Sequence, residues 1–304
     1  MKQFIIKTGL IGGCVVFFLA ILYVIVPVRP NHYLQAYKQK CELLDSVPSP
    51  RIIFVGGSNF AFGLDSKRIQ DSLHINVINY GLHAGIGLKY MLDDVVSYVR
   101  KGDILIFSPE WQHFYTLMYG EGATLPFIPR VEGLRKLQLF NQQQIITLIK
   151  GIPTYLQQNL IPQKITPKTY LASNFNQYGD EVRHWTLENK FISHPKLIQT
   201  NFNQRFGRYF ITELKKLQQQ CRVYIFPPAC CQNAFATWQL QIKEVSLFLS
   251  KEGFPFLVSP EKFVFPEEYM YDTDYHLNKK GVDQRTDLII ETLKPYVKDT
   301  TRNY

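Results

Sequence analysis

The 304-residue sequence lacks the features that define several common protein classes. It has only five cysteines, and none of them has the spacing of a metal-binding motif. The formal net charge is +9, but the basic residues are spread along the chain and form no stripe of the kind that binds nucleic acid. Internal repeats and low-complexity tracts are also absent. These absences argue against a metal centre, a nucleic-acid partner and a repeat protein.

Charge is missing altogether from residues 9–28, a length that matches the roughly 20 residues of a membrane-spanning helix. The run continues well past Cys14, so a retained anchor is favoured over a cleaved signal peptide. Lysines and an arginine flank it on both sides, so the positive-inside rule does not decide its orientation. Because the tail before it is very short, we expect a cytoplasmic N-terminus. We expect an anchor at 1–28, a linker with a short helix at 29–50, and an extracytoplasmic domain at 51–304.

Apolar runs alternate with amphipathic segments from residue 51 onwards. The runs RIIFV, INVIN, ILIF, RVYIF and FPFLV predict five strands. The segments between them have helical spacing, and Asp65 is placed to cap one of these helices. Strands that are apolar throughout and alternate with helices are typical of a parallel sheet covered on both faces. The sequence therefore predicts an α/β fold, a three-layer α/β/α sandwich with a five-stranded parallel sheet.

The alternation is interrupted between about residues 111 and 200. One long helix is predicted in LRKLQLFNQQQIITLIKGIPTYLQQ, and an aromatic, loop-rich stretch follows it. We interpret this segment as an insertion over the site side of the sheet, and a separate small domain is the alternative. Aromatic rings stack on sugar faces, so several exposed rings here would form a platform for a polymer. The candidate rings are Trp111, Phe114, Tyr115, Tyr119, Tyr170, Phe175, Tyr178 and Trp185.

Ligands of an open α/β sheet bind beyond the carboxyl ends of its strands, where this chain has the loops VGGSN, NYGLHAGIG, SPEWQHF and YDTDYHLNKKG. Gly56 and Gly57 permit a sharp turn that brings Ser58 to the edge of the sheet. A serine hydroxyl needs a base to act as a nucleophile. Of the seven histidines, only His276 has carboxylates close to it in the sequence and lies in one of these loops. We therefore expect Ser58 and His276 to approach within hydrogen-bond distance.

Asp272 and Asp274 are the candidates to orient the ring of His276. We favour Asp272, because its longer return lets the carboxylate reach the far ring nitrogen without straining the neighbouring residues. The small residues of NYGLHAGIG allow backbone N–H groups to point inward. Together with the N–H of Ser58, the N–H groups near Ala84 and Gly85 would form an oxyanion hole.

These loops, in this order, resemble the motif blocks of the SGNH (GDSL-like) hydrolase superfamily. FVGGSNFAFG is similar to the block that carries the serine, INYGLHAG to the block with an oxyanion glycine, and YDTDYHLNKKG to the block with Asp and His. With the single N-terminal span, LIFSPEWQHF and HLN resemble a membrane-anchored branch that includes D-alanyl-lipoteichoic-acid transfer proteins and polysaccharide O-acyl-modification proteins. The resemblance implies ester hydrolysis or acyl transfer on a cell-surface polymer, without a cofactor.

The chain departs from the superfamily's pattern in two places. The last block usually has Asp three residues before His, where this chain has Thr273. The third block usually supplies an Asn to the oxyanion, and the matching SPEWQ contains none. Glu110, Trp111 or Gln112 would have to stand in, and Asn59 is a further candidate contact. Because the loss of one oxyanion donor costs roughly 100-fold to 1,000-fold in rate, a slow enzyme or one that needs a partner is expected.

Two functions are therefore open at this point. The first is a membrane-anchored serine esterase or O-acyltransferase that acts on an extracytoplasmic cell-envelope polysaccharide or a similar polymer. The second is a catalytically inactive SGNH-like scaffold or binding subunit of a complex that modifies such a polymer, which the two departures favour. The expected partners are the glycan or acylated polymer, membrane lipid through the N-terminal helix, and a membrane acyl-transfer protein.

Overall fold

A four-stranded parallel sheet forms the centre of the domain in the computed structural model, which describes residues 1–161, 168–188 and 191–298. The strands are β1 (Arg51–Gly56), β2 (Asn76–Asn79), β3 (Ile104–Ser108) and β4 (Arg222–Ile225), in the order β2-β1-β3-β4. All residues of β1 and β3 are buried, as expected for strands that are covered on both faces. The α/β class and the parallel sheet are thereby confirmed.

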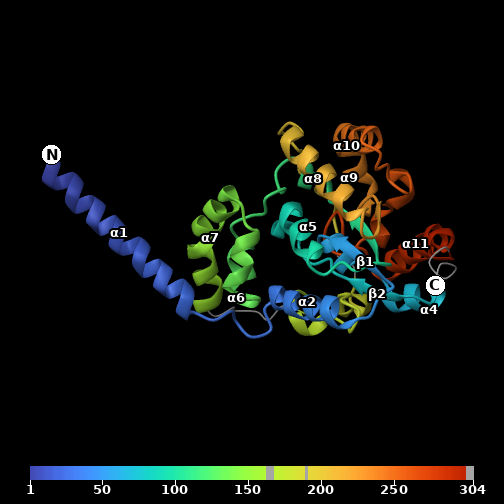
Figure 1. Cartoon of the computed structure of the whole chain (residues 1–304), viewed down its shortest axis with the longest axis horizontal. Helices are drawn as coiled ribbons and strands as arrows, with labels where there is room; N and C mark the ends of the chain where they lie inside the picture. The colour runs from blue at the N-terminus through green and yellow to red at the C-terminus, as the bar shows by residue number, and fades with distance from the viewer. Residues whose placement is uncertain (162–167, 189–190, 299–304) are drawn as a thin grey trace.

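Helices flank the sheet, with α5 and α8 on one side and α4 and α11 on the other (Figure 1). The α-helices are α1 (Lys2–Ile25), α2 (Ala36–Ser46), α3 (Ser58–Ala61), α4 (Ser66–Leu73), α5 (Leu88–Val96), α6 (Ile128–Val131), α7 (Gln142–Leu160), α8 (Gln204–Leu217), α9 (Gln232–Thr237), α10 (Gln239–Lys251) and α11 (Lys279–Lys298). The 3-10 helices are η1 (Tyr33–Gln35), η2 (Ala84–Ile86), η3 (Trp111–Phe114), η4 (Leu125–Phe127), η5 (Leu134–Leu139), η6 (Ala172–Asn174), η7 (Arg183–Thr186), η8 (Pro260–Phe263) and η9 (Glu267–Tyr269).

The fifth strand that FPFLV predicted does not form. Its segment makes one isolated parallel bridge, between Ile225 and Phe256, and the N–H of Leu257 donates to the carbonyl of Ile225 at 2.8 Å. Pro255 has no N–H to donate, which limits how far a ladder beside β4 can extend. The other strands described, β5 (Cys230–Cys231) and β6 (Val264–Phe265), form a separate two-residue parallel pair.

The N-terminal helix α1 extends away from the domain (Figure 1). Within the described residues, it is the one helix that is long and apolar enough to cross a membrane, from Ile6 to Ile25. Its last turn packs against α7, where the rings of Tyr23 and Tyr155 lie 5.2 Å apart. The hydroxyl of Tyr155 also donates to the carbonyl of Val26 at 2.8 Å. The C-terminal end of the apolar helix is therefore attached to the domain by direct contacts.

The segment predicted as one long helix in the insertion is divided between η5 and α7. The division occurs at Asn141, whose side chain accepts a hydrogen bond from the N–H of Gln144 at 2.9 Å. The side chain of Gln144 accepts one in return from the N–H of Asn141, which completes a capping box. Residues 162–167 and 189–190 of the insertion lie outside the described residues.

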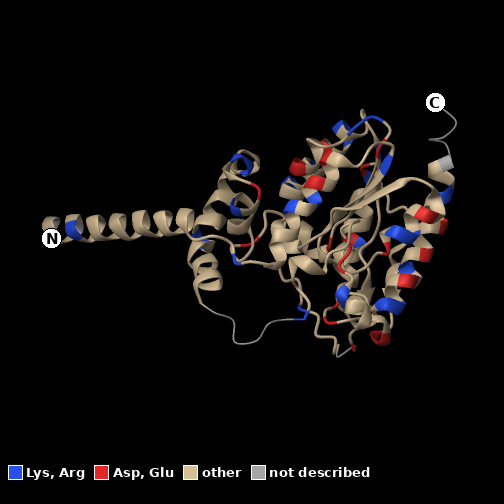
Figure 2. Cartoon of the chain, turned by 90° about the horizontal axis from the view of Figure 1, so that it is seen from below, with Lys and Arg blue, Asp and Glu red and all other residues tan. Residues whose placement is uncertain are grey.

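Basic and acidic residues are intermixed along the ribbon of the domain (Figure 2). Among the residues drawn in colour, the blue positions lie on several helices and loops and not along one of them.

Candidate functional site

The turn after β1 places Ser58 at the start of α3, beyond the carboxyl end of the strand. Gly57 precedes it in a position where a side chain would be crowded. A Cβ atom there would lie 2.5 Å from Oε1 of Glu110 and 3.1 Å from the backbone N of Ala84. The same is true of Gly56, where a Cβ would lie 2.8 Å from a carbonyl oxygen of the neighbouring strand. Close packing against β3 and the next two loops therefore favours glycine at both positions.

Asn59 and Arg285 connect this turn to β3 and α11 through hydrogen bonds. The side chain of Asn59 is fully buried and donates to the carbonyl of Ser108 at 3.1 Å. Arg285, from α11, donates to the carbonyl of Asn59 at 2.5 Å and to its Oδ1 at 3.0 Å. The guanidinium also lies over the ring of Phe60, at 4.9 Å from the centroid. Asn59 was a candidate contact for the oxyanion or the substrate, and in this structure its amide is fully buried and bonded to Ser108 and Arg285.

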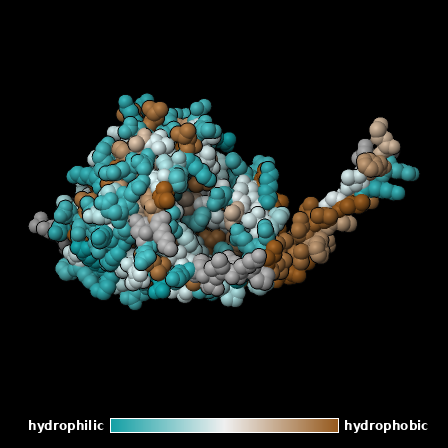
Figure 3. Space-filling view, turned by 180° about the vertical axis from the view of Figure 1, so that it is seen from behind, coloured by the Kyte–Doolittle hydropathy of each residue, from teal (hydrophilic) through white to brown (hydrophobic). Residues whose placement is uncertain are grey.

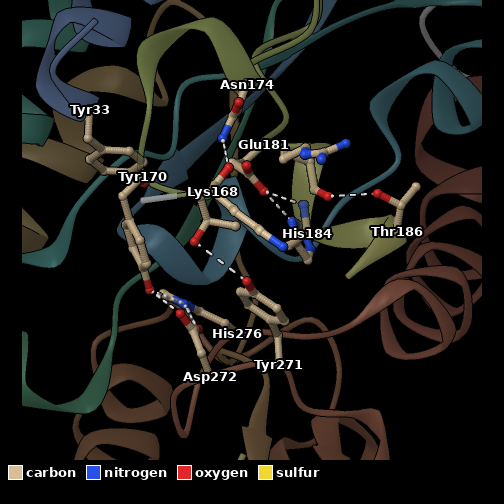
Figure 4. A network of polar contacts seen from close by, with 12 residues as sticks. Tyr33, Lys168, Tyr170, Asn174, Glu181, His184, Thr186, Tyr271, Asp272 and His276 are labelled. Atoms are coloured by element: carbon tan, nitrogen blue, oxygen red, sulfur yellow. Dashed lines mark hydrogen bonds and ion pairs between the residues drawn. The ribbon is translucent and has the colours of Figure 1, made fainter. Parts of the chain in front are cut away.

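The loop before α11 brings His276 and Asp272 together (Figure 4). Nδ1 of His276 lies 2.7 Å from Oδ1 of Asp272, and the hydroxyl of Tyr170 donates to Oδ2 of Asp272 at 2.5 Å. The same hydroxyl lies 3.3 Å from Nδ1 of His276. Burial acts to raise the pKa of Asp272, but the hydrogen bonds from His276 and Tyr170 outweigh it, and the pKa is lowered. The carboxylate is therefore ionised at neutral pH and faces Nδ1 of the ring.

Asp274 has different partners. Its Oδ1 accepts hydrogen bonds from the hydroxyl of Ser193 at 2.7 Å and from the thiol of Cys231 at 3.2 Å. Its carbonyl accepts from the N–H of Cys231 at 3.1 Å. Of the two carboxylates that the sequence offered, Asp272 contacts the ring of His276 and Asp274 connects the loop to β5.

His276 lies next to the turn that carries Ser58. Its ring stacks on that of Phe62, with centroids 4.2 Å apart and planes 5° apart. The N–H of Phe62 in turn donates to the carbonyl of Ser58 at 2.9 Å. However, within the described part of the chain the hydroxyl of Ser58 makes no hydrogen bond, so the bond expected with His276 is not formed in this structure. Because Nδ1 faces Asp272, Nε2 is the ring nitrogen available to a serine.

The expected oxyanion donors differ in their availability. The N–H of Ser58 is the first of α3 and that of Ala84 is the first of η2, and the first N–H of a helix has no acceptor within it. The N–H of Gly85 instead donates to Nδ1 of His83 at 2.9 Å. Ser58 and Ala84 therefore retain free backbone donors, whereas Gly85 is already engaged.

The side chains considered in the SPEWQ loop are packed or bonded within the protein. Glu110 is buried, accepts from the N–H of Asn59 at 3.3 Å, and has its pKa raised by burial. Trp111 is 1% exposed. Oε1 of Gln112 accepts from the hydroxyl of Tyr275 at 2.5 Å. Glu110 thus supports the Ser58 turn, Trp111 is enclosed in the core, and Gln112 contacts Tyr275.

The exposed aromatic platform expected in the insertion is not present. All eight rings lie within the described residues, and none of them is exposed. Four are core side chains, namely Trp111, Phe114, Tyr115 and Phe175. The other four are half-buried, namely Tyr119, Tyr170, Tyr178 and Trp185. Large rings contribute most when they are packed, and here they stabilise the insertion in place of a substrate surface.

Sequence reasoning missed Phe62, Arg285 and His83, and it named Tyr170 only as an aromatic ring and not as a partner of Asp272. Tyr170 lies in a loop of the insertion, about 100 residues before Asp272, so local spacing carries no signal for the pair. Among the described residues there is no group of three or more His, Cys, Asp or Glu side chains that could hold a metal ion.

Comparison of the chain with protein-family models, curated proteins and solved structures finds no match.

Proposed function

We propose that this chain is a serine-dependent ester hydrolase or O-acyltransferase with an SGNH-like fold. Its domain would be anchored by α1 on the extracytoplasmic side of a membrane, and its substrate would be a cell-envelope polysaccharide or similar polymer. The observation that carries the proposal is the Asp272–His276 pair stacked beside the Ser58 turn. Asp272 holds Nδ1, which leaves Nε2 as the base.

The reaction follows from these positions. The hydroxyl oxygen of Ser58 attacks the ester carbonyl carbon while its proton passes to Nε2 of His276. The carbonyl electron pair moves onto the oxygen, where the N–H groups of Ser58 and Ala84 stabilise it. Collapse expels the alcohol, which takes the proton from His276 and leaves the acyl group on Ser58. Water or a polymer hydroxyl then attacks the acyl carbon, and His276 accepts that proton and returns it to Ser58.

A fluorophosphonate probe tests this proposal on the full-length chain in detergent, because only an activated serine labels rapidly. We expect labelling at Ser58, with loss of the label in Ser58→Ala and in His276→Ala. Replacement of exposed His194 by Ala serves as a control and should leave the labelling rate unchanged. Absence of labelling in the unmodified chain would reject the enzyme.

The free hydroxyl of Ser58 favours a second candidate function, an inactive scaffold or binding subunit of a polymer-modifying complex. In that case the hydrogen bond between Asp272 and His276 would only stabilise the loop before α11. Immobilised chain would then retain envelope polymer equally well with and without Ser58→Ala, while the probe would leave both unlabelled.

A further inference from the structure

His83 lies in the loop between β2 and η2, between two residues that contact the nucleophile turn. On one side, the N–H of Leu82 donates to the carbonyl of Gly56 at 3.4 Å. On the other, the backbone of Ala84 is so close to Gly57 that a Cβ on this glycine would approach it to 3.1 Å. The loop therefore brings the backbone around His83 against the turn that carries Ser58, although the sequence drew attention only to its small neighbours.

Aromatic contacts connect the ring of His83 with the Asp272–His276 pair. The rings of His83 and Tyr33 are edge-on, with centroids 6.3 Å apart. Tyr33 lies 5.5 Å from the ring of Tyr170, whose hydroxyl donates to Asp272 (Figure 4). His83 is thus connected to the Asp272–His276 pair through the rings of Tyr33 and Tyr170.

The hydrogen bond from Gly85 determines which nitrogen of His83 carries a proton. Nδ1 accepts from the N–H of Gly85 at 2.9 Å, so the neutral ring has its proton on Nε2. Burial, followed by the charges of His276 and His32, lowers the pKa of His83 to about 4, so the ring is neutral at pH 7. The side chain is half-buried, and within the described residues its Nε2 makes no hydrogen bond. An unused, neutral N–H donor therefore lies at the site.

We propose that Nε2–H of His83 donates a hydrogen bond to the carbonyl oxygen of the substrate, in place of the Asn that SPEWQ lacks. This inference rests on the proposed function. When Ser58 bonds to the carbonyl carbon, the carbonyl electron pair moves onto the oxygen and strengthens this hydrogen bond. A neutral imidazole keeps its proton through the step, whereas the Ser58 proton passes to His276. The site then has three donors, from His83 and from the backbone of Ser58 and Ala84.

The rate constant for fluorophosphonate labelling of the full-length chain tests the role of His83, because the phosphoryl oxygen occupies the oxyanion position. We expect His83→Ala to label roughly 100-fold to 1,000-fold more slowly, the usual effect of one lost donor. His83→Asn, which retains an N–H donor, should recover part of the rate, and the His194→Ala control should match the unmodified chain. If Ser58 labels and His83→Ala matches the unmodified rate, the role of His83 is rejected while the proposed function stands. If Ser58 does not label, both fail.

A second measurement does not depend on catalysis. In ¹⁵N-histidine NMR spectra of the full chain in lipid nanodiscs, His83 should show the neutral Nε2–H form from pH 6 to 8. A proton on Nδ1, or a charged ring at pH 7, would overturn the proposal.

A different surface, on α7, carries an independent inference. Four apolar side chains on and just after this helix are well exposed: Ile146, Ile149, Leu160 and Ile161. The same helix packs against the last turn of α1 through Tyr155 and Tyr23. The exposed surface of α1 is apolar up to the point where it meets the domain (Figure 3). If α1 spans a bilayer, these side chains continue its apolar surface at the level where the bilayer begins.

We infer that α7 lies in the membrane interface, with Ile146 and Ile149 in contact with lipid. The continuity with α1 identifies the bilayer as the occupant, because the α7 surface begins where the lipid-facing surface of α1 ends. Leu240 on α10 is a matched control, since it is 79% exposed and belongs to a helix on the far side of the domain (Figure 1).

Quenching by brominated lipids tests this position in the full-length chain. Cys14, the exposed native cysteine, is replaced by Ala, and a fluorophore is attached to the thiol of an Ile149→Cys, Leu240→Cys or Phe18→Cys variant. The chain is reconstituted in vesicles of phosphatidylcholine and phosphatidylglycerol with brominated acyl chains. We expect the probe at 149 to be quenched to a similar extent as the one at 18 in α1, and the probe at 240 to be unaffected. Quenching at 149 no greater than at 240 would overturn the inference.

Discussion

Replacement of Asp272 by Asn removes the charge beside His276 and preserves the size of the side chain. In the structure one carboxylate oxygen faces Nδ1 of the ring at 2.7 Å, and the other accepts from Tyr170 at 2.5 Å. An Asn has one acceptor oxygen, so its NH₂ group must face either the ring or the tyrosine hydroxyl. If it faces the ring, the histidine takes the tautomer with its proton on Nε2, which cannot accept the proton of Ser58.

The same replacement in serine hydrolases with this arrangement costs about 10⁴-fold in turnover, equivalent to roughly 5 kcal/mol in the barrier. The side chain of Asp272 is 31% exposed, so water reaches it and reduces the electrostatic part of the effect. We therefore expect a loss of about 10³-fold to 10⁴-fold in the labelling rate of Ser58, at unchanged thermal stability.

Asp274→Asn is the matched control, because Oδ1 of an Asn can still accept from Ser193 and Cys231. We expect that variant to label within about threefold of the unmodified chain. A larger loss for Asp274→Asn than for Asp272→Asn would refute the assignment of Asp272 as the residue that orients the ring.

Three further predictions concern stability and topology. Burial lowers the pKa of His113 from its ordinary 6.5 to about 4. Between these pH values the unfolded chain binds more protons than the folded chain. The free energy of unfolding should therefore decrease as the pH falls from 6.5 to 4. His113→Gln does not titrate and should show a smaller decrease in denaturant titrations; an identical pH dependence would contradict this account. Gly57→Ala should lower the free energy of unfolding by about 1–3 kcal/mol, because its Cβ would lie 2.5 Å from Glu110; a change below about 0.5 kcal/mol would show that the loops yield. Alkaline phosphatase fused to the C-terminus should be active in cells, and activity of a cytoplasm-only reporter would reverse the assigned side.

The sequence predicted the buried strands and the helix cap, because these depend on residues that are close together in the chain. The apolar runs of β1 and β3 are buried along their whole length, and Asp65 caps α4 by accepting from the N–H of Arg68 at 3.1 Å. The prediction of a fifth strand was wrong because an apolar run does not show how many backbone hydrogen bonds it can form with a neighbouring strand. Pro255 lies within that run, so the sequence did contain a sign against a regular strand.

The candidate site was predictable where its partners are close in the sequence. Asp272 and His276 are four residues apart, and one loop brings them into contact. The support for Ser58 comes from greater distances, since Arg285 is 226 residues from Asn59. A single sequence carries no pattern for such pairs. The prediction of an exposed aromatic platform was wrong for a different reason. Composition does not distinguish a ring that packs in the core from one that faces a substrate.

The contacts of Tyr170 also change the expected relation between the anchor and the site. The segment that carries it is paired with the chain just after α1, through the bridge of His32 with Leu171 and the hydrogen bond from the N–H of Ala172 to Asn31 at 3.2 Å. Tyr170 then reaches Asp272, and Asp272 holds His276. The chain between the apolar helix and the domain is therefore folded onto the insertion and does not act as a free tether. If α1 spans the membrane, the distance from the bilayer to His276 is set by packed residues, which suits a substrate that is itself fixed to the envelope.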